Sequence, residues 1–302
     1  MNHTPPPQLR CGLIGAGPWA HQTQAPALSA HGGVAFTGVW ARRPEAAAEL
    51  ATEHGVAAYS GEEGIDALLA DCEAVAFALP PDAQAPLAAR AAAAGRHLLL
   101  DKPVATDVAA AREAVDAALG AGVASVVFCT LRFAPDTETW IEEQSALGGW
   151  FTAQARWLGA RYAHGVDSVS PPSPWRRERG GLWDVGPHAL SVLIPILGDV
   201  TSLSAVPGPA DTVHLTLRHS SGASSALTLG LSAPAGAAGT RVELLGDHGK
   251  SVMPKWNDPV TAFRGAIDEL RAAIRTDRPH PCDIRFGLRL TELLAEAESQ
   301  LS

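Results

Sequence analysis

The chain has 302 residues, of which 46% are hydrophobic and 18% are charged, and its net charge is −9. A chain of this length and apolar content can bury a substantial core in about two domains, so a disordered protein is not expected. Nucleic-acid binding is not expected either, because it usually needs a basic face and the sequence has no long basic run.

The first part of the chain alternates strand-like and helix-like patterns. The expected strands are 9–14, 34–41, 74–79, 97–100 and 125–131. The expected helices are 18–30 (with Pro26 bending it), 44–54, 65–70, 85–94 and 107–119. Alternating units of this size predict an α/β domain with a parallel, doubly wound sheet of the Rossmann type.

The second part has successive strands without intervening helices, which predicts an α+β domain with a mostly antiparallel sheet. The expected strands are 151–158, 213–218, 223–231 and 240–245. Helices are expected near 182–197, 260–275 and 287–301. We place the domain boundary near residue 131, which gives domains 1–131 and 132–302.

A glycine-rich turn follows the first strand. Gly15 and Gly17, with Ala20 in third place, match the pattern G-x-G-x-x-G/A that opens the first helix. The first glycine permits a tight turn, the second lets the backbone approach a diphosphate, and the small third residue allows close helix–strand packing. The turn therefore predicts dinucleotide binding; the alternative is a tight turn with no ligand.

The end of the second strand indicates which dinucleotide binds. NAD sites usually carry an Asp or Glu there, on the ribose hydroxyls, but this chain has Ala41 followed by Arg42 and Arg43. Either arginine can bind a 2′-phosphate by charge-assisted hydrogen bonds, so NADP(H) is favoured over NAD(H). The alternative is that both arginines are solvated surface residues.

The cysteines are isolated. Cys11, Cys72, Cys129 and Cys282 form no C-x-x-C pair, so we expect reduced, buried thiols, no metal site and a cytoplasmic location. No signal peptide is expected, because the polar N-terminus lacks an apolar region, and no membrane partner, because no unbroken apolar stretch reaches about 18 residues.

Several motifs give the chain a wider resemblance. Residues 94–103 are similar to A-G-K-H-V-x-x-E-K-P, and residues 180–188 to G-G-x-x-x-D-x-G-x-H. With the glycine turn at 12–17, the strand end at 78–81 and R-F-x-P at 132–135, the chain resembles the Gfo/Idh/MocA family of NAD(P)-dependent oxidoreductases.

This resemblance implies a Rossmann domain followed by an α/β domain with a large open sheet that is often used for dimerisation, so we expect a homodimer or homotetramer. It also implies hydride transfer to or from a small-molecule substrate, with Lys102, Asp184 and His188 as the reactive cluster. Trp175 and Arg176 are candidate substrate contacts. Cofactor contacts are expected from Gly15, Gly17, Pro18, Trp19, Arg42, Arg43, Leu79, Pro80, Asp101 and Lys102.

The chemistry of these residue types agrees with those roles. His188 suits a proton acceptor near neutral pH, and Asp184, four residues earlier, shares its face in a helix and can orient the imidazole. Lys102 follows a strand at the ligand-binding edge of the sheet and can stabilise an alkoxide. The alternatives are a surface-turn lysine, a helix histidine with satisfied bonds, a helix-start aspartate, and a packed Trp175 beside a solvated arginine.

Four positions depart from these patterns. Asp101 replaces the family's usual Glu, Gln84 replaces a usual His, and Ser191 replaces an Asp that sugar-using members often employ. Pro187 lies between Asp184 and His188 and can kink the helix.

The leading hypothesis is an NADP(H)-preferring dehydrogenase or reductase acting on a hydroxyl or carbonyl carbon of a sugar-like molecule or secondary metabolite. An imine reductase, a non-catalytic dinucleotide-binding regulator and an NAD-dependent glycoside-cleaving enzyme remain alternatives. The retained lysine, aspartate and histidine favour an enzyme.

Overall fold

The computed structural model describes residues 7–163 and 174–301. The polar N-terminus, residues 1–6, lies outside the described part. The chain divides into two compact units. The first holds the residues up to Phe128 together with Asp258–Leu288, and the second holds Cys129–Asn257 and the residues from Arg289 onward. The sequence placed one boundary near residue 131 and assigned all of 258–288 to the second domain.

The first unit is built on a six-stranded sheet in the order β3-β2-β1-β4-β5-β6, in which all paired strands are parallel. This doubly wound order confirms the predicted Rossmann-type sheet. The strands are β1 (Leu9–Ile14), β2 (Val34–Trp40), β3 (Ala57–Tyr59), β4 (Ala74–Phe77), β5 (His97–Asp101) and β6 (Ser125–Phe128). The helices are η1 (Ala20–Gln24), α1 (Ala25–Ala30), α2 (Pro44–His54), α3 (Gly61–Asp71), α4 (Pro81–Ala93), α5 (Val108–Gly120) and α8 (Pro259–Thr276).

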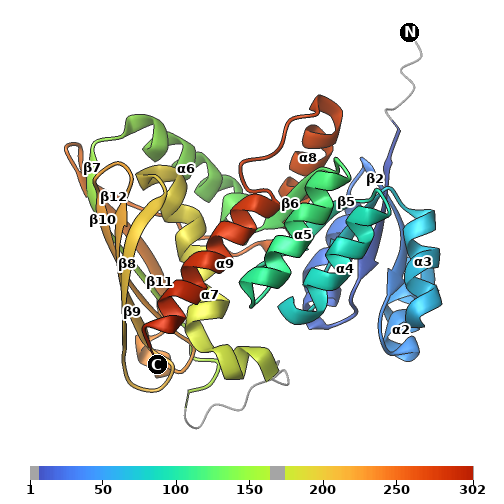
Figure 1. The fold of residues 1–302 in the computed structure, drawn as a ribbon, viewed down its shortest axis with the longest axis horizontal. Coiled ribbons are helices and arrows are strands. Elements are labelled where there is room, and N and C mark those ends of the chain that lie inside the picture. Colours follow the sequence, from blue (N-terminus) through green and yellow to red (C-terminus); the bar gives the residue numbers. More distant parts are fainter. Residues whose placement is uncertain (1–6, 164–173, 302) are drawn as a thin grey trace. The chain divides into compact units, whose positions relative to one another are not determined.

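Helices cover both faces of this sheet. Right-handed connections run in opposite directions from the central strand β1, so α1 lies on one face and α4 and α5 lie on the other. The late helix α8 packs against α1, β5 and β6, and Figure 1 shows α8 beside β6. The central strand β4 and the edge strand β6 are both wholly buried, which is why they consist almost entirely of apolar residues.

The expected helix at 18–30 is two shorter elements. A π-helical turn, η1, precedes α1, and Pro26 occupies the first turn of α1, where its missing N–H costs no helical bond. The expected strand at 125–131 ends earlier, at Phe128, and the short 3-10 helix η2 (Thr130–Arg132) follows it. The short strand β3 was not predicted.

The second unit is built on a six-stranded sheet in the order β12-β11-β7-β10-β9-β8. Only the β7–β10 pair is parallel, so the predicted mostly antiparallel sheet is confirmed. The strands are β7 (Trp150–Leu158), β8 (Val200–Pro207), β9 (Val213–His219), β10 (Ser224–Gly230), β11 (Gly239–Gly246) and β12 (Gly249–Val252). The helices are α6 (Pro135–Leu147), α7 (Pro174–Leu197), η3 (Ala235–Ala237) and most of α9 (Ile284–Ser299).

One face of this sheet packs on α7, which contacts β7, β9 and β10. Strand β9 alternates strictly between buried and exposed residues, as expected for a sheet with one covered and one open face. Among the described helices, α7 alone is long and apolar enough to cross a membrane, and 89% of its most apolar window is buried inside the protein. That burial is typical of a core helix.

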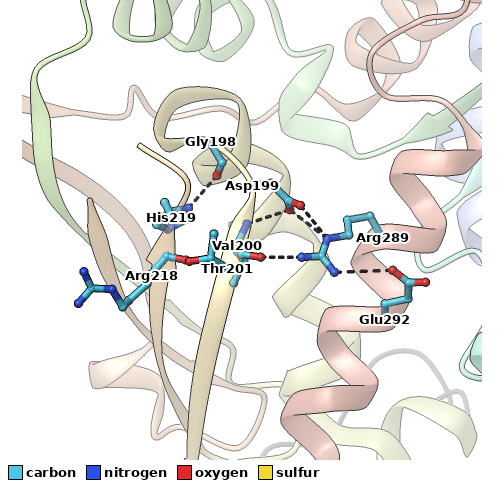
Figure 2. A network of polar contacts seen from close by, with 8 residues as sticks. All are labelled: Gly198, Asp199, Val200, Thr201, Arg218, His219, Arg289 and Glu292. Atoms are coloured by element: carbon cyan, nitrogen blue, oxygen red, sulfur yellow. Dashed lines mark hydrogen bonds and ion pairs between the residues drawn. The ribbon is translucent and has the colours of Figure 1, made fainter. Parts of the chain in front are cut away.

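Helix α9 is tied to strand β8 by a polar network (Figure 2). Arg289 on α9 donates from Nε to both carboxylate oxygens of Asp199, at 3.0 and 3.2 Å, and from Nη2 to the Val200 carbonyl at 2.6 Å. Nearby, the imidazole of His219 bonds the Gly198 carbonyl through Nδ1 at 2.8 Å. These bonds hold β8, the edge strand that follows α7 in the chain, against α9.

Candidate active site

The turn after β1 has the geometry that its glycines predict. Gly15 has a φ of +124°, and a Cβ there would lie 2.3 Å from the carbonyl oxygen of Ala78, so a larger residue does not fit. At Gly17 a Cβ would meet no heavy atom of the described chain within 4 Å. The second glycine therefore opens space beside the backbone at the start of η1, where a ligand can approach closely.

A cavity of about 270 Å³ lies beside this turn. It brings together three predicted groups: the glycine turn, the two arginines after β2 and the residues after β4. Its lining includes Gly15, Gly17, Trp40, Arg42, Arg43, Ala78, Leu79 and Pro80. Pro18 and Trp19 follow the turn, and the Trp19 ring stacks on Phe128 with 6.5 Å between centroids.

This cavity fits one end of a dinucleotide. The open space at Gly17 leaves room for a diphosphate against backbone amides, and no carboxylate lines the cavity among the described residues. Arg42 and Arg43 are both exposed, and neither forms an ion pair within the described ranges. Two guanidinium groups are thus available at its rim.

Lys102 lies directly after β5, in a segment held by Gln84 of α4. The buried amide of Gln84 donates to the carbonyls of Asp101, Pro103 and Val104 at 2.8–3.2 Å, and its Oε1 accepts from the Asp101 N–H at 2.9 Å. The carboxylate of Asp101 in turn accepts from the Lys102 N–H at 2.7 Å. Gln84, which we noted as a departure, therefore positions the backbone that carries Lys102.

The other two candidate residues lie on α7, in the second unit. This helix has a break at Gly180 (φ 62°, ψ −161°), and the segment after the break begins at Gly181. A Cβ at Gly181 would lie 2.4 Å from the Gly230 Cα, so the close approach of α7 to β10 requires glycine. Asp211 anchors this junction, because its carboxylate accepts the N–H groups of Gly181, Leu231 and Ser232 at 2.8–2.9 Å.

Asp184 and His188 lie one helical turn apart on α7. The helix continues through Pro187, so the proline does not separate them, and the same-face expectation agrees with the helix geometry. Asp184 is buried, and its carboxylate accepts from Arg176 Nε at 2.9 Å. The imidazole of His188 stacks on the Trp157 ring of β7, with centroids 4.8 Å apart and planes inclined by 15°.

The remaining predicted residues also have defined contacts. Trp175 is buried, and the Arg176 guanidinium lies 4.7 Å from its ring centroid while bonding Asp184. Ser191 is fully buried and donates its hydroxyl to the His188 carbonyl at 2.9 Å. Its hydroxyl satisfies the helix backbone, which differs from the substrate role of the family's aspartate at this position.

Sequence reasoning missed three residues of this region: Trp157, Tyr162 and Asp211. A tryptophan at a strand end and an aspartate in a turn are common in proteins, and neither has a spacing that signals a site. Across the described residues, no three histidine, cysteine or acidic side chains gather in a group that could hold a metal ion.

The fold and the glycine turn define the class: a Rossmann-type dinucleotide-binding protein with a second α/β unit. The family "Oxidoreductase family, NAD-binding Rossmann fold" (Gfo/Idh/MocA) matches residues 9–128, and the Gfo/Idh/MocA C-terminal domain matches residues 137–252. The chain belongs to the Gfo/Idh/MocA family of NAD-binding oxidoreductases, as the sequence motifs indicated.

Similar proteins include several dehydrogenases and reductases. The 4-carboxy-2-hydroxymuconate-6-semialdehyde dehydrogenase of Sphingobium sp. is 25% identical over 97% of this chain and 99% of its own. The dTDP-3,4-didehydro-2,6-dideoxy-alpha-D-glucose 3-reductase of Streptomyces antibioticus is 29% identical over 67% of this chain and 61% of its own. The WlbA dehydrogenase of Bordetella pertussis, solved with NADH and UDP-GlcNAcA, shares the fold with a TM-score of 0.82 at 20% identity, over 98% of this chain and 96% of that one.

Proposed function

We propose that the protein is an NADP(H)-preferring dehydrogenase or reductase that transfers a hydride between the nicotinamide and the hydroxyl or carbonyl carbon of a small, sugar-like molecule or secondary metabolite. The observation that carries this proposal is the cavity beside β1, where the glycine turn meets Arg42 and Arg43. The sugar dehydrogenases and reductases among its relatives support the substrate class.

The residues of the first unit hold the cofactor in this proposal. Gly15 and Gly17 leave room for the diphosphate, while Arg42 and Arg43 bind the 2′-phosphate through charge-assisted hydrogen bonds. A bound nicotinamide cofactor accepts or supplies the hydride. Lys102, positioned by Gln84, donates a hydrogen bond to the substrate oxygen and stabilises the negative charge that develops on it.

The residues of α7 move the proton. His188 takes the proton from the substrate hydroxyl during oxidation and returns it during reduction. Asp184 lies one helical turn away, where its carboxylate is bonded to Arg176. The stack of His188 on Trp157 fixes the plane of the imidazole.

Cofactor binding and turnover test this function separately. NADPH should raise the melting temperature more than NADH does, because a ligand that binds the folded state stabilises it by mass action. Replacing Arg42 and Arg43 by alanine should remove that difference. NADPH consumption with a panel of ketoses should then fall by about 10²–10⁴-fold in Lys102→Met and His188→Ala, with unchanged melting shifts.

Other results of these binding and turnover measurements would contradict the proposal or indicate a different function. An equal response to NADH and NADPH would contradict the cofactor preference. Cofactor binding without consumption on ketoses or imines would instead indicate a regulator, and consumption on imines alone would indicate an imine reductase. The exposed Arg264→Ala variant on α8 serves as the control for the loss of an arginine elsewhere in the first unit.

We further propose a cytoplasmic homodimer or homotetramer. Exposed apolar side chains on the sheet of the second unit, Phe151 on β7 and Val206 on β8, support self-association. The four cysteines are buried thiols without a disulfide, which agrees with a reducing compartment. Light scattering of the purified protein measures the oligomeric state.

A further inference from the structure

Tyr162, four residues after the end of β7, has a buried hydroxyl that the proposed mechanism does not use. Its oxygen is shielded from solvent and has no hydrogen-bond partner within the described residues. The backbone N–H of Tyr162 donates to the Leu231 carbonyl at 2.9 Å, which fixes the residue beside the end of β10. A buried hydroxyl without a partner is destabilising, and a ligand oxygen that accepts from it would remove that cost.

Positive charge lies close to the Tyr162 ring. The Arg177 guanidinium lies 5.7 Å from the centroid of the Tyr162 ring. The charges that act on the phenol are Arg161, Arg176, Arg177 and Asp184. Asp184 is bonded to Arg176, whereas Arg161 and Arg177 form no ion pair with any described residue. Among the charged groups that act on the phenol, three are cations and one is an anion, which favours an anionic ligand at the hydroxyl.

The phenol is a hydrogen-bond donor in this environment. Burial is the main cause that raises the pKa of Tyr162 above its ordinary value, so the hydroxyl keeps its proton at neutral pH. A protonated phenol and a guanidinium together offer the donors that a carboxylate or phosphate accepts.

The same stretch of chain also reaches the proposed reactive residues. Trp157 on β7 stacks on His188, and Tyr162, five residues further on, lies within electrostatic range of Asp184. An acidic group held at Tyr162 would therefore lie in the same part of the second unit as Asp184 and His188.

We propose that Tyr162 and Arg177 bind an oxyanion of the substrate, a carboxylate or a phosphate, beside the Asp184–Arg176 ion pair. This inference rests on the proposed function and narrows its substrate class from neutral sugars to acidic ones. Tyr162 donates its hydroxyl to one oxygen, and Arg177 supplies the charge. Arg176 stays committed to Asp184.

Calorimetric titration of the full-length protein, with and without NADPH, tests the site with three probes that share a ring: glucose, glucuronate and glucose 6-phosphate. We expect the better acid to bind at least about tenfold more tightly than glucose, since one hydrogen bond to a charged group is worth about that factor. The carboxylate and phosphate probes show which acid the site prefers.

Two variants locate the effect. Tyr162→Phe removes only the hydroxyl and Arg177→Gln removes only the charge, and each should weaken acid binding about tenfold while glucose binding stays unchanged. Tyr59→Phe, which removes the hydroxyl bonded to Asp71 in the first unit, is the matched control and should leave all three affinities unchanged.

Acids that bind no better than glucose, or a Tyr162→Phe variant with unaltered acid affinity, would overturn the inference. That failure is separable from failure of the proposed function, because NADPH binding and NADPH consumption with neutral ketoses are measured independently. A protein that consumes NADPH with neutral sugars and ignores the acids keeps its function and loses this site.

Discussion

Gln84 is a single buried side chain that holds the backbone on both sides of Lys102. Its amide N–H groups satisfy carbonyls of Asp101, Pro103 and Val104, and its oxygen satisfies the Asp101 N–H. This amide therefore holds the backbone from which the Lys102 side chain extends. One residue on α4 thus controls a candidate catalytic group 18 positions away.

Gln84→Glu should be strongly disruptive, because it replaces the amide donor by a second acceptor that faces three carbonyls. We expect a loss of about 1–3 kcal/mol in the free energy of unfolding, together with a fall in kcat/KM. Gln84→His, which restores the residue common in the family and keeps a ring N–H donor, should be milder on both measures. Urea denaturation and steady-state kinetics check this order, and equal stability of the two variants would contradict it.

The sequence named Gln84 only as a departure from the family's histidine. Its hydrogen-bond partners lie 17–20 residues further along the chain, so they become visible only when α4 and β5 are packed together. The glycine turn was different, because φ at Gly15 and the open space at Gly17 are properties of a local motif. Local constraints could be predicted from the sequence, and long-range hydrogen bonds could not.

Helix α7 carries the candidate proton-transfer residues, and its placement depends on a junction at Gly180 and Gly181. Asp211 joins that junction to the end of β10 by accepting three backbone N–H groups. The close approach of α7 to β10 requires glycine at Gly181, because a Cβ there would lie 2.4 Å from the Gly230 Cα.

Asp211→Ala should lower the free energy of unfolding by about 1–3 kcal/mol, because it leaves buried N–H groups without acceptors. It should also reduce kcat, since Asp184 and His188 follow the start of the helix. Asp211→Asn keeps one carbonyl oxygen and should fall between the alanine variant and the wild type. Glu178→Ala, at an exposed position on the same helix, is the control and should change neither quantity. An Asp211→Ala variant as stable as wild type would refute the anchoring role.

Among the helices and strands, those with a long periodic pattern of apolar residues could be predicted from the sequence, and those with a weak pattern were missed. Helix α6 contains few apolar residues and carries acidic ones in its first turn, and strand β8 alternates small polar with apolar residues. The N-terminal part of α7 was missed because two adjacent glycines lower helix propensity. In each case packing against the rest of the unit, rather than intrinsic preference, determines the structure.

Across the whole molecule, each unit contains a histidine whose neutral form is favoured: half-buried His97 in the first unit and buried His219 in the second. Burial is the main cause that lowers the pKa of His97 in the first unit and of His219 in the second, below the ordinary value of 6.5. The imidazole of His219 is fully bonded as a neutral ring, to Gly198 and Ser225 at 2.8 Å each.

The protein should therefore lose stability as the pH falls below 6.5. Between pH 6.5 and the lowered pKa values, these histidines bind protons in the unfolded chain but stay neutral in the folded chain. The free energy of unfolding therefore decreases as the pH falls through this range. Replacing both histidines by asparagine, whose amide can take the place of Nδ1, should flatten this dependence. Melting temperatures measured across the range test the expectation, and an equally steep decline in the double variant would contradict it.

The position of residues 258–288 in the first unit could not be predicted from the sequence. Helix α8 has a strongly amphipathic pattern that predicts a packed helix but does not name its partner. Contacts with β6 determine where this segment packs. Phe263 meets Phe128 edge to face, with 4.8 Å between ring centroids, and the Cys282 carbonyl accepts from the Val127 N–H at 2.8 Å.

The return of residues 258–288 to the first unit has a consequence for biosynthesis. When the ribosome has finished β6, the nucleotide-binding half still lacks the helix that shields β5, β6 and α1 from water. The nascent protein must synthesise about 130 intervening residues before that apolar surface is covered, which takes roughly 6–26 seconds at typical elongation rates. Until then the half-made domain is a natural client for chaperones that bind exposed hydrophobic surface.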